Sequence, residues 1–118
     1  MELQRKILKT LRSLYKDDGC EVGGYIKDWD VVVCENDSPN PVENFSFKME
    51  DLEKINDEEG FIALFHTHPN GTAAMTKQDF KAFVNYPSFF HLIVGKDDLL
   101  CYKVTERETV IIEDINES

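Results

Sequence analysis

Two histidines and a carboxylate lie close together near the middle of this sequence. His66 and His68 end the apolar run of residues 61–65, and Asp79 follows one loop later. A short apolar run bounded by Gly60 is typical of a buried strand, and alternate residues of a strand project from the same face. We therefore expect both imidazoles on one face. Two nitrogens and one carboxylate oxygen would leave a tetrahedral zinc ion one open position for water, which is the catalytic arrangement.

Each of these residues also has a purely structural interpretation. A His-x-His pair at the end of a strand can lie beside a loop without any metal. Thr76 and Asp79 have the spacing of a capping box, in which the Asp79 carboxylate accepts a backbone hydrogen bond at the start of a helix. We favour metal ligation because the pair and the carboxylate occur together, after a strand and before Pro69.

A metal-bound water also needs a base. Zinc lowers the pKa of its water, but the proton must be accepted and then delivered to the leaving amine. A glutamate is the usual agent, and the metal site alone does not select one. Glu21 lies at the start of an expected strand between Cys20 and Val22, where a buried carboxylate costs free energy unless it is paired or used. From the strand alone, an exposed edge position is the simpler interpretation of Glu21.

The composite pattern resembles the JAMM (MPN-plus) metallopeptidase motif. That motif has an early glutamate, a glycine, a large apolar residue, then His-Ser/Thr-His-Pro, a serine and an aspartate. The matching residues are Glu21, Gly24, Ile26, His66, His68, Pro69, Thr76 and Asp79. Thr76 lies ten residues after His66, and Asp79 thirteen after it, which is the spacing of the family. The resemblance extends from the first helix to the strands near Val104.

The resemblance implies a role for each site residue. His66, His68 and Asp79 would hold Zn²⁺, and Glu21 would carry the proton from the metal-bound water to the leaving nitrogen. Thr76 stands where the family has serine, whose hydroxyl helps to stabilise the oxyanion. The chain would thus be a zinc-dependent peptidase or isopeptidase with a JAMM/cytidine-deaminase-like fold.

The substrate stays open. Small bacterial domains and phage tail-tip assembly proteins are the most similar part of the family, which implies cleavage of peptidoglycan peptides or of a tail protein, with a tail-tip or cell-wall hydrolase partner. Other prokaryotic relatives imply cleavage of the tails of ubiquitin-like or sulfur-carrier proteins. A non-catalytic assembly module with the same fold is the second class of function. A zinc nucleoside deaminase is excluded, because its His-x-Glu and Pro-Cys-x-x-Cys motifs are absent from the sequence.

Composition limits the partners. A chain of 118 residues with 42% hydrophobic residues is most simply one domain, residues 1–118, of ordinary globular type. The net charge of −10 argues against nucleic acid and against an anionic membrane surface as partners. Charges from Glu2 onward argue against a signal peptide, and no apolar run spans a bilayer. Cys20, Cys34 and Cys101 contain no CxxC pair and indicate reduced thiols, so we expect a cytoplasmic protein, or a virion-associated one if phage-encoded.

Hydrophobic periodicity and turn residues predict the elements that position the site. Helices are expected at residues 2–16, 49–56 and 76–84. Strands are expected at residues 21–28, 31–34, 45–47, 61–66, 89–94, 99–104 and 109–113, with tight turns at 29–30 and 95–98. Residues 36–44 and 70–75 are expected to be loops at the lips of the site, and His91 to be structural or exposed near a core aromatic cluster. The interleaved order predicts an α/β (α+β) sandwich, with a central mixed sheet flanked by helices.

Overall fold

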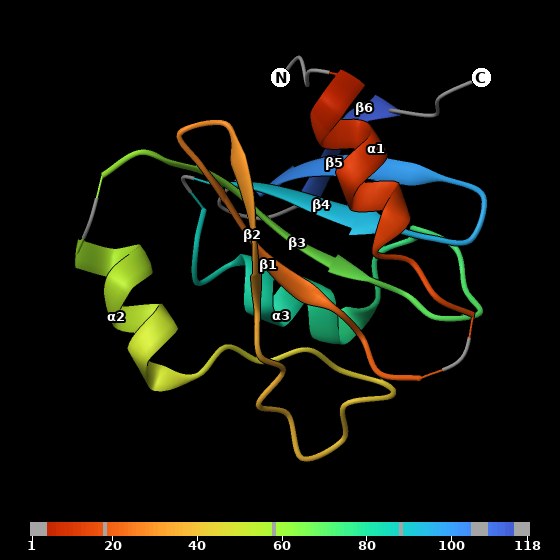
Figure 1. Ribbon diagram of the computed structural model, residues 1–118, viewed down its shortest axis with the longest axis horizontal. Coiled ribbons are helices and arrows are strands. Elements are labelled where there is room, and N and C mark those ends of the chain that lie inside the picture. The colour runs from red at the N-terminus through yellow and green to blue at the C-terminus, as the bar shows by residue number, and fades with distance from the viewer. Residues whose placement is uncertain (1–4, 18, 58, 88, 105–108, 115–118) are drawn as a thin grey trace.

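The computed structural model describes residues 5–17, 19–57, 59–87, 89–104 and 109–114 (Figure 1). These ranges contain three helices and six strands. In chain order they are α1 (Arg5–Ser13), β1 (Gly23–Lys27), β2 (Asp30–Cys34), α2 (Met49–Asp57), β3 (Phe61–Thr67), α3 (Lys77–Phe83), β4 (Phe90–Val94), β5 (Leu99–Val104) and β6 (Thr109–Asp114). No helix in the described ranges has the length and apolarity that crossing a membrane requires.

The strands form one mixed sheet in the order β2-β1-β3-β4-β5-β6. β3 and β4 are parallel, and every other neighbouring pair is antiparallel. A parallel pair needs a crossover connection, and α3 lies in the segment that joins β3 to β4. β3, which contains His66 and ends one residue before His68, is a central strand that is hydrogen-bonded on both sides, as the apolar run predicts.

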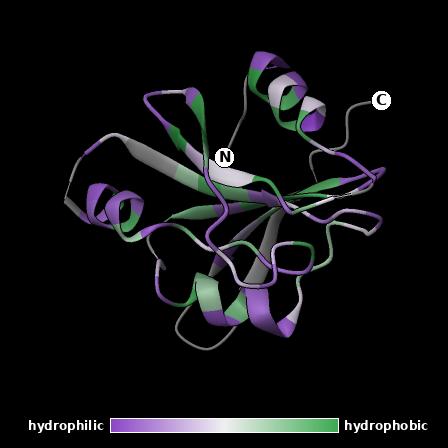
Figure 2. Cartoon of the chain, turned by 60° about the horizontal axis from the view of Figure 1, so that its bottom comes forward, coloured by the Kyte–Doolittle hydropathy of each residue, from purple (hydrophilic) through white to green (hydrophobic). Residues whose placement is uncertain are grey.

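Helices cover both faces of the sheet. Phe65 of β3 packs in the core cluster that α1 completes with Ile7 and Leu11. Leu64 points to the opposite face, where it packs with Ile55 of α2. Figure 2 shows α1 on one side of the sheet and α2 and α3 on the other. The predicted α/β architecture, a mixed sheet flanked by helices, is confirmed.

The first hairpin turns one residue earlier than predicted. Asp28 and Trp29 have positive φ values of 51° and 66°, the conformation of a type I′ turn, and β2 begins at Asp30. The Asp28 N–H donates to the Gly60 carbonyl at 2.9 Å, which fixes the turn against the start of β3. The predicted strand 21–28 accordingly shortens to Gly23–Lys27.

Residues 45–47 are not a strand, and the prediction of one is wrong. The Asp37 N–H donates to the Ser46 carbonyl at 2.9 Å, and the Ser46 N–H contacts the Asn36 side-chain oxygen at 3.3 Å. The alternating phenylalanines gave a strand pattern, but these hydrogen bonds tie the segment into a loop.

The remaining boundaries differ from the predictions by a few residues. α1 ends at Ser13 rather than at residue 16, because the N–H groups of Leu14 and Tyr15 bond to carbonyls three residues earlier and tighten the last turn. Its predicted first residues, 2–4, lie outside the described residues, as does the tail 115–118. α2, α3, β3, β4, β5 and β6 agree with their predictions to within one residue.

Candidate metal centre

Three side chains converge at the end of β3. The Nε2 atoms of His66 and His68 are 3.1 Å apart. Asp79 approaches both rings, with Oδ1 at 2.9 Å from His66 Nε2 and Oδ2 at 3.0 Å from His68 Nε2. A tetrahedral zinc ion with bonds of about 2.0–2.1 Å separates its ligand atoms by about 3.3–3.4 Å. The observed separations are a few tenths of an ångström shorter, and Asp79 uses a different oxygen for each ring, so the three side chains are grouped closely enough to hold such an ion.

The hydrogen bond of His68 favours a positive charge in this cluster, carried either by a second proton on His68 or by a metal ion. His68 Nδ1 lies 2.8 Å from the Thr72 carbonyl, which can only accept, so Nδ1 carries a proton. In the neutral ring Nε2 is then an acceptor, and it faces the Asp79 carboxylate, which is also an acceptor. This contact is favourable only if His68 is doubly protonated or if a metal ion lies between them. The bond to Thr72 is also the support that metal-binding imidazoles usually have.

The electrostatics of the cluster agree with this geometry. Burial lowers the pKa of His68, but the Asp79 carboxylate, the Thr72 carbonyl and the charge of Glu21 outweigh it and leave the pKa raised. Burial raises the pKa of Asp79, but the hydrogen bonds from His66 and His68 outweigh it and hold the pKa well below its usual range. Asp79 is thus an anion that faces the Nε2 atoms of His66 and His68.

The capping box and the cluster share the same carboxylate. The Thr76 N–H donates to Asp79 Oδ2 at 3.0 Å, and the Asp79 N–H donates to Thr76 Oγ1 at 3.1 Å. Asp79 therefore caps α3 and reaches the two histidines at once. The two interpretations that the sequence left open are compatible. Thr76 lies at the helix N-cap, with its hydroxyl oxygen engaged by the Asp79 backbone.

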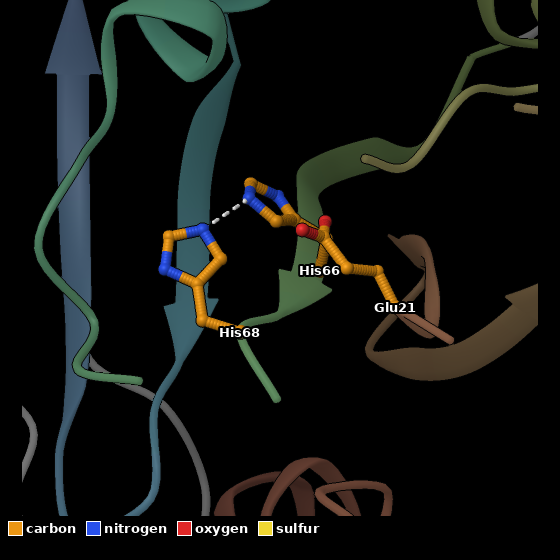
Figure 3. Close-up of side chains that lie close together, drawn as sticks. All are labelled: Glu21, His66 and His68. Atoms are coloured by element: carbon orange, nitrogen blue, oxygen red, sulfur yellow. Dashed lines mark hydrogen bonds between the residues drawn. The ribbon is translucent and has the colours of Figure 1, made fainter. Parts of the chain in front are cut away.

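Glu21 belongs to the same cluster, although it lies 45 residues before His66. Its side chain is buried at 7% exposure, not on an exposed strand edge. A carboxylate oxygen of Glu21 and one ring nitrogen from each of His66 and His68 lie within 4.8 Å of one another (Figure 3). Burial raises the pKa of Glu21 to about 8, with His68 opposing the shift and Asp79 adding to it. A buried carboxyl with a strongly raised pKa beside two imidazoles is typical of a functional site.

Backbone contacts place Glu21 beside the histidines. The Glu21 N–H donates to the Pro41 carbonyl at 2.7 Å, and the Asn36 amide donates to the Glu21 carbonyl at 2.9 Å. On the other side, the Val22 N–H donates to Thr67 Oγ1 at 3.0 Å, and the Thr67 N–H donates back to the Val22 carbonyl at 2.8 Å. The threonine between the two histidines thus joins the Glu21 segment to β3.

Asn36 is a positioning residue that the sequence did not reveal. Besides Glu21, its amide nitrogen donates to the Asn44 carbonyl at 2.9 Å, and its oxygen accepts from the Ser38 N–H at 3.0 Å. One side chain therefore holds both the Glu21 backbone and the loop between β2 and α2. In the sequence, Asn36 is only the first residue of a turn-rich segment.

Two glycines permit close approach around β1. A Cβ at Gly23 would lie 2.7 Å from the Phe45 ring, so that ring packs directly on the backbone of the strand. A Cβ at Gly24 would overlap the carbonyl oxygen of Val32. Gly23 is also the register partner of His66. The loop that carries Phe45 is therefore packed on the sheet beside the metal centre.

A cavity of about 640 Å³ opens beside His66 and Asp79. Residues 44–47, residues of α3 and Tyr86 are among those that line it. Of the two loops expected at the lips, the first contributes only Asn44. Residues 70–75 do not line this cavity. Instead, this loop contacts the site through the Thr72 carbonyl, which lies 2.8 Å from His68 Nδ1.

The third histidine lines the same cavity but is not part of the His66–His68–Asp79 cluster, and neither are the cysteines. His91 is 2% exposed, stacks on Phe83 with ring centroids 4.2 Å apart, and its Nε2 lies 3.0 Å from the Tyr86 carbonyl. Burial lowers the pKa of His91 to about 4, so His91 is a neutral core residue. Of the two expectations, structural or exposed, the structural one is confirmed. Cys20, Cys34 and Cys101 are all free thiols, as predicted.

The sequence matches no family model and no curated protein. A function for this chain therefore has to be inferred from the residues of the site and from the motif that they form.

Proposed function

We propose that this chain is a zinc-dependent metallopeptidase or isopeptidase of the JAMM type, with the JAMM/cytidine-deaminase-like version of the α/β fold. The supporting observation is the convergence of Glu21 with His66, His68 and Asp79 from three separate stretches of the chain. The motif resemblance names the same four residues. Their packing into one cluster is what the proposed chemistry requires.

Zinc, when bound, polarises the amide carbonyl and acidifies a water molecule. His66, His68 and Asp79 would hold the ion, with their donor atoms already grouped. Glu21, beside the two histidines, accepts the proton of the attacking water and delivers it to the leaving nitrogen. Burial alone would keep Glu21 protonated near neutral pH, because its pKa is about 8. A divalent cation nearby lowers that pKa and makes the carboxylate available as a base.

Thr76 completes the proposed site. Its oxygen accepts the Asp79 N–H, which leaves its hydroxyl proton available to a substrate oxygen. Loss of one such donor costs about 3–4 kcal/mol of transition-state stabilisation in well-studied hydrolases. Thr76→Ser should therefore retain activity, whereas Thr76→Val should lose most of it.

The substrate classes that the motif suggests are peptide crosslinks or stems of peptidoglycan, a phage tail protein, and the tails of ubiquitin-like or sulfur-carrier proteins. A cleavage panel of peptidoglycan fragments and ubiquitin-like fusions separates them, with zinc-loaded protein and with Glu21→Gln as the inactive control. The proposal predicts cleavage of at least one member, lost in the variant. Failure to bind zinc, or cleavage that survives Glu21→Gln, contradicts it.

A further inference from the structure

The charges around the cavity differ from those of the whole chain. The chain contains 23 acidic and 13 basic residues. Among the described residues that line the cavity, the carboxylate is that of Asp79, which the metal centre uses, whereas Lys77 and Lys81 line the α3 wall. An acidic protein thus presents two ammonium groups beside its candidate active site.

These two lysines have no charge partner in the part of the chain that the structure describes. Described ion pairs such as those of Lys48 with Glu35 and of the histidines with Asp79 do not involve either lysine. Lys77 and Lys81 are four residues apart on one short helix, so they are neighbours and repel each other. A pair of unpartnered like charges on one wall costs the free protein stability, which a ligand of opposite charge would recover.

The other residues that line the cavity have a different chemistry. Phe45 and Phe47 pack edge to face there, with ring centroids 4.9 Å apart, and Leu52 lies beside them. The amides of Asn44 and Gln78 supply hydrogen-bonding groups at the edge. The cavity therefore combines an apolar wall, a cationic wall and polar groups that suit a peptide backbone.

We propose that this cavity, here called the α3 groove, binds an acidic peptide segment next to the scissile bond. Asp or Glu side chains of the segment pair with Lys77 and Lys81, and an apolar side chain packs on Phe45 and Phe47. The inference rests on the proposed peptidase function and names its substrate class. The groove begins at His66 and Asp79, so a segment bound there leads directly to the metal centre.

Binding tests the groove without requiring catalysis. Three labelled octapeptides share one apolar residue and carry Glu, Gln or Lys at the other variable positions, and fluorescence anisotropy measures their affinity for the zinc-loaded Glu21→Gln protein. Two solvent-exposed ion pairs should favour the Glu peptide over the Gln peptide by about 2- to 30-fold, with the Lys peptide weakest. The preference should shrink at high salt because these charges are exposed.

Charge-reversal variants test whether Lys77 and Lys81 cause the preference for the Glu peptide. Lys77→Glu with Lys81→Glu should invert the order of the peptides, and the two Lys→Gln changes should abolish it. The matched control is Lys6→Glu with Lys9→Glu, which makes the same change in net charge on α1, on the opposite face of the sheet. The control should keep the wild-type order. Equal affinity for all three peptides, or an order that survives the α3 reversal, overturns the inference.

A cleavage assay with the same peptides separates this inference from the proposed function. Cleavage of all three peptides at equal efficiency by the wild-type enzyme supports the peptidase and overturns the charge preference. Charge-dependent binding without cleavage supports the groove and argues against the peptidase.

Discussion

The most informative single change is Asn36→Ala, because Asn36 joins the Glu21 backbone to the loop that lines the cavity. Its three shortest side-chain hydrogen bonds, of 2.9, 2.9 and 3.0 Å, are to Glu21, Asn44 and Ser38, and two longer ones involve the Pro41 carbonyl and the Ser46 N–H. At about 1 kcal/mol for each bond, their loss amounts to about 3 kcal/mol. The loop is partly exposed and water replaces some of these contacts, so we expect a loss of about 2 kcal/mol in the free energy of unfolding.

Asn36→Ala should lower kcat more than it lowers the affinity for zinc. None of the proposed zinc ligands hydrogen-bonds to Asn36, so zinc affinity should change less than about twofold. The Glu21 carboxylate, however, loses the bond that fixes its backbone, and small displacements of a general base cost about 10- to 100-fold in kcat. Urea unfolding, zinc titration and peptide cleavage measure the three quantities separately.

Two further variants make the test specific. Asn36→Asp keeps the acceptor but places an oxygen against the carbonyls of Glu21 and Asn44, so it should be at least as damaging as Asn36→Ala. Asn40→Ala removes one exposed hydrogen bond, to Glu43, and should be nearly silent. The positioning role of Asn36 is refuted if Asn36→Ala unfolds within about 0.5 kcal/mol of wild type and cleaves substrate at the wild-type rate.

The other predictions concern the metal, the base, the glycine contact and the core histidine. The protein should bind about one zinc ion, Asp79→Ala should weaken binding more than about 100-fold by calorimetry, and Glu21→Gln should keep the zinc but lose about 100-fold or more in kcat. Gly23→Ala should displace the Phe45 ring, destabilise the fold by about 1–3 kcal/mol in urea and raise KM. His91, with its folded pKa lowered to about 4 from 6.5, contributes fully above pH 6.5. As the pH falls toward 4, only the unfolded chain takes up this proton, so stability should drop by about 3 kcal/mol relative to a His91→Gln variant measured at the same pH values.

The sequence predicted the sheet because its strongest signals are local. The apolar run before His66 is long enough to define a buried strand, and glycine and proline mark its limits. The short segment 45–47 shows where local patterns fail. Its alternating phenylalanines fit a strand as well as they fit a packed loop. The hydrogen bond from the Ser46 N–H to the Asn36 side chain favours the loop, and the sequence does not reveal that contact.

The site was predictable to a similar, limited extent. The His-x-His spacing predicts two rings on one face, so their proximity followed from strand geometry alone, whereas the metal remains a proposal. Glu21 did not follow from it, because its position depends on contacts across 45 residues, between Val22 and Thr67. Only the resemblance to a known motif selected this glutamate among many. The lysines of the α3 groove carry no sequence signal, because a charged helix face usually indicates only exposure to solvent.

The two sets of contacts of Asp79 explain how a short helix could position the proposed metal ligand accurately. A carboxylate on a long exposed side chain loses conformational entropy when it binds an ion. Asp79 is already held by the Thr76 N–H, and its own N–H is held by the Thr76 hydroxyl, so little freedom remains to be lost. The same bonds fix the start of α3, and therefore the direction in which Lys77 and Lys81 face the cavity. Removing the metal should consequently leave α3 folded. Thr76→Ala, in contrast, should destabilise α3, weaken zinc binding and reduce the preference of the groove for acidic peptides.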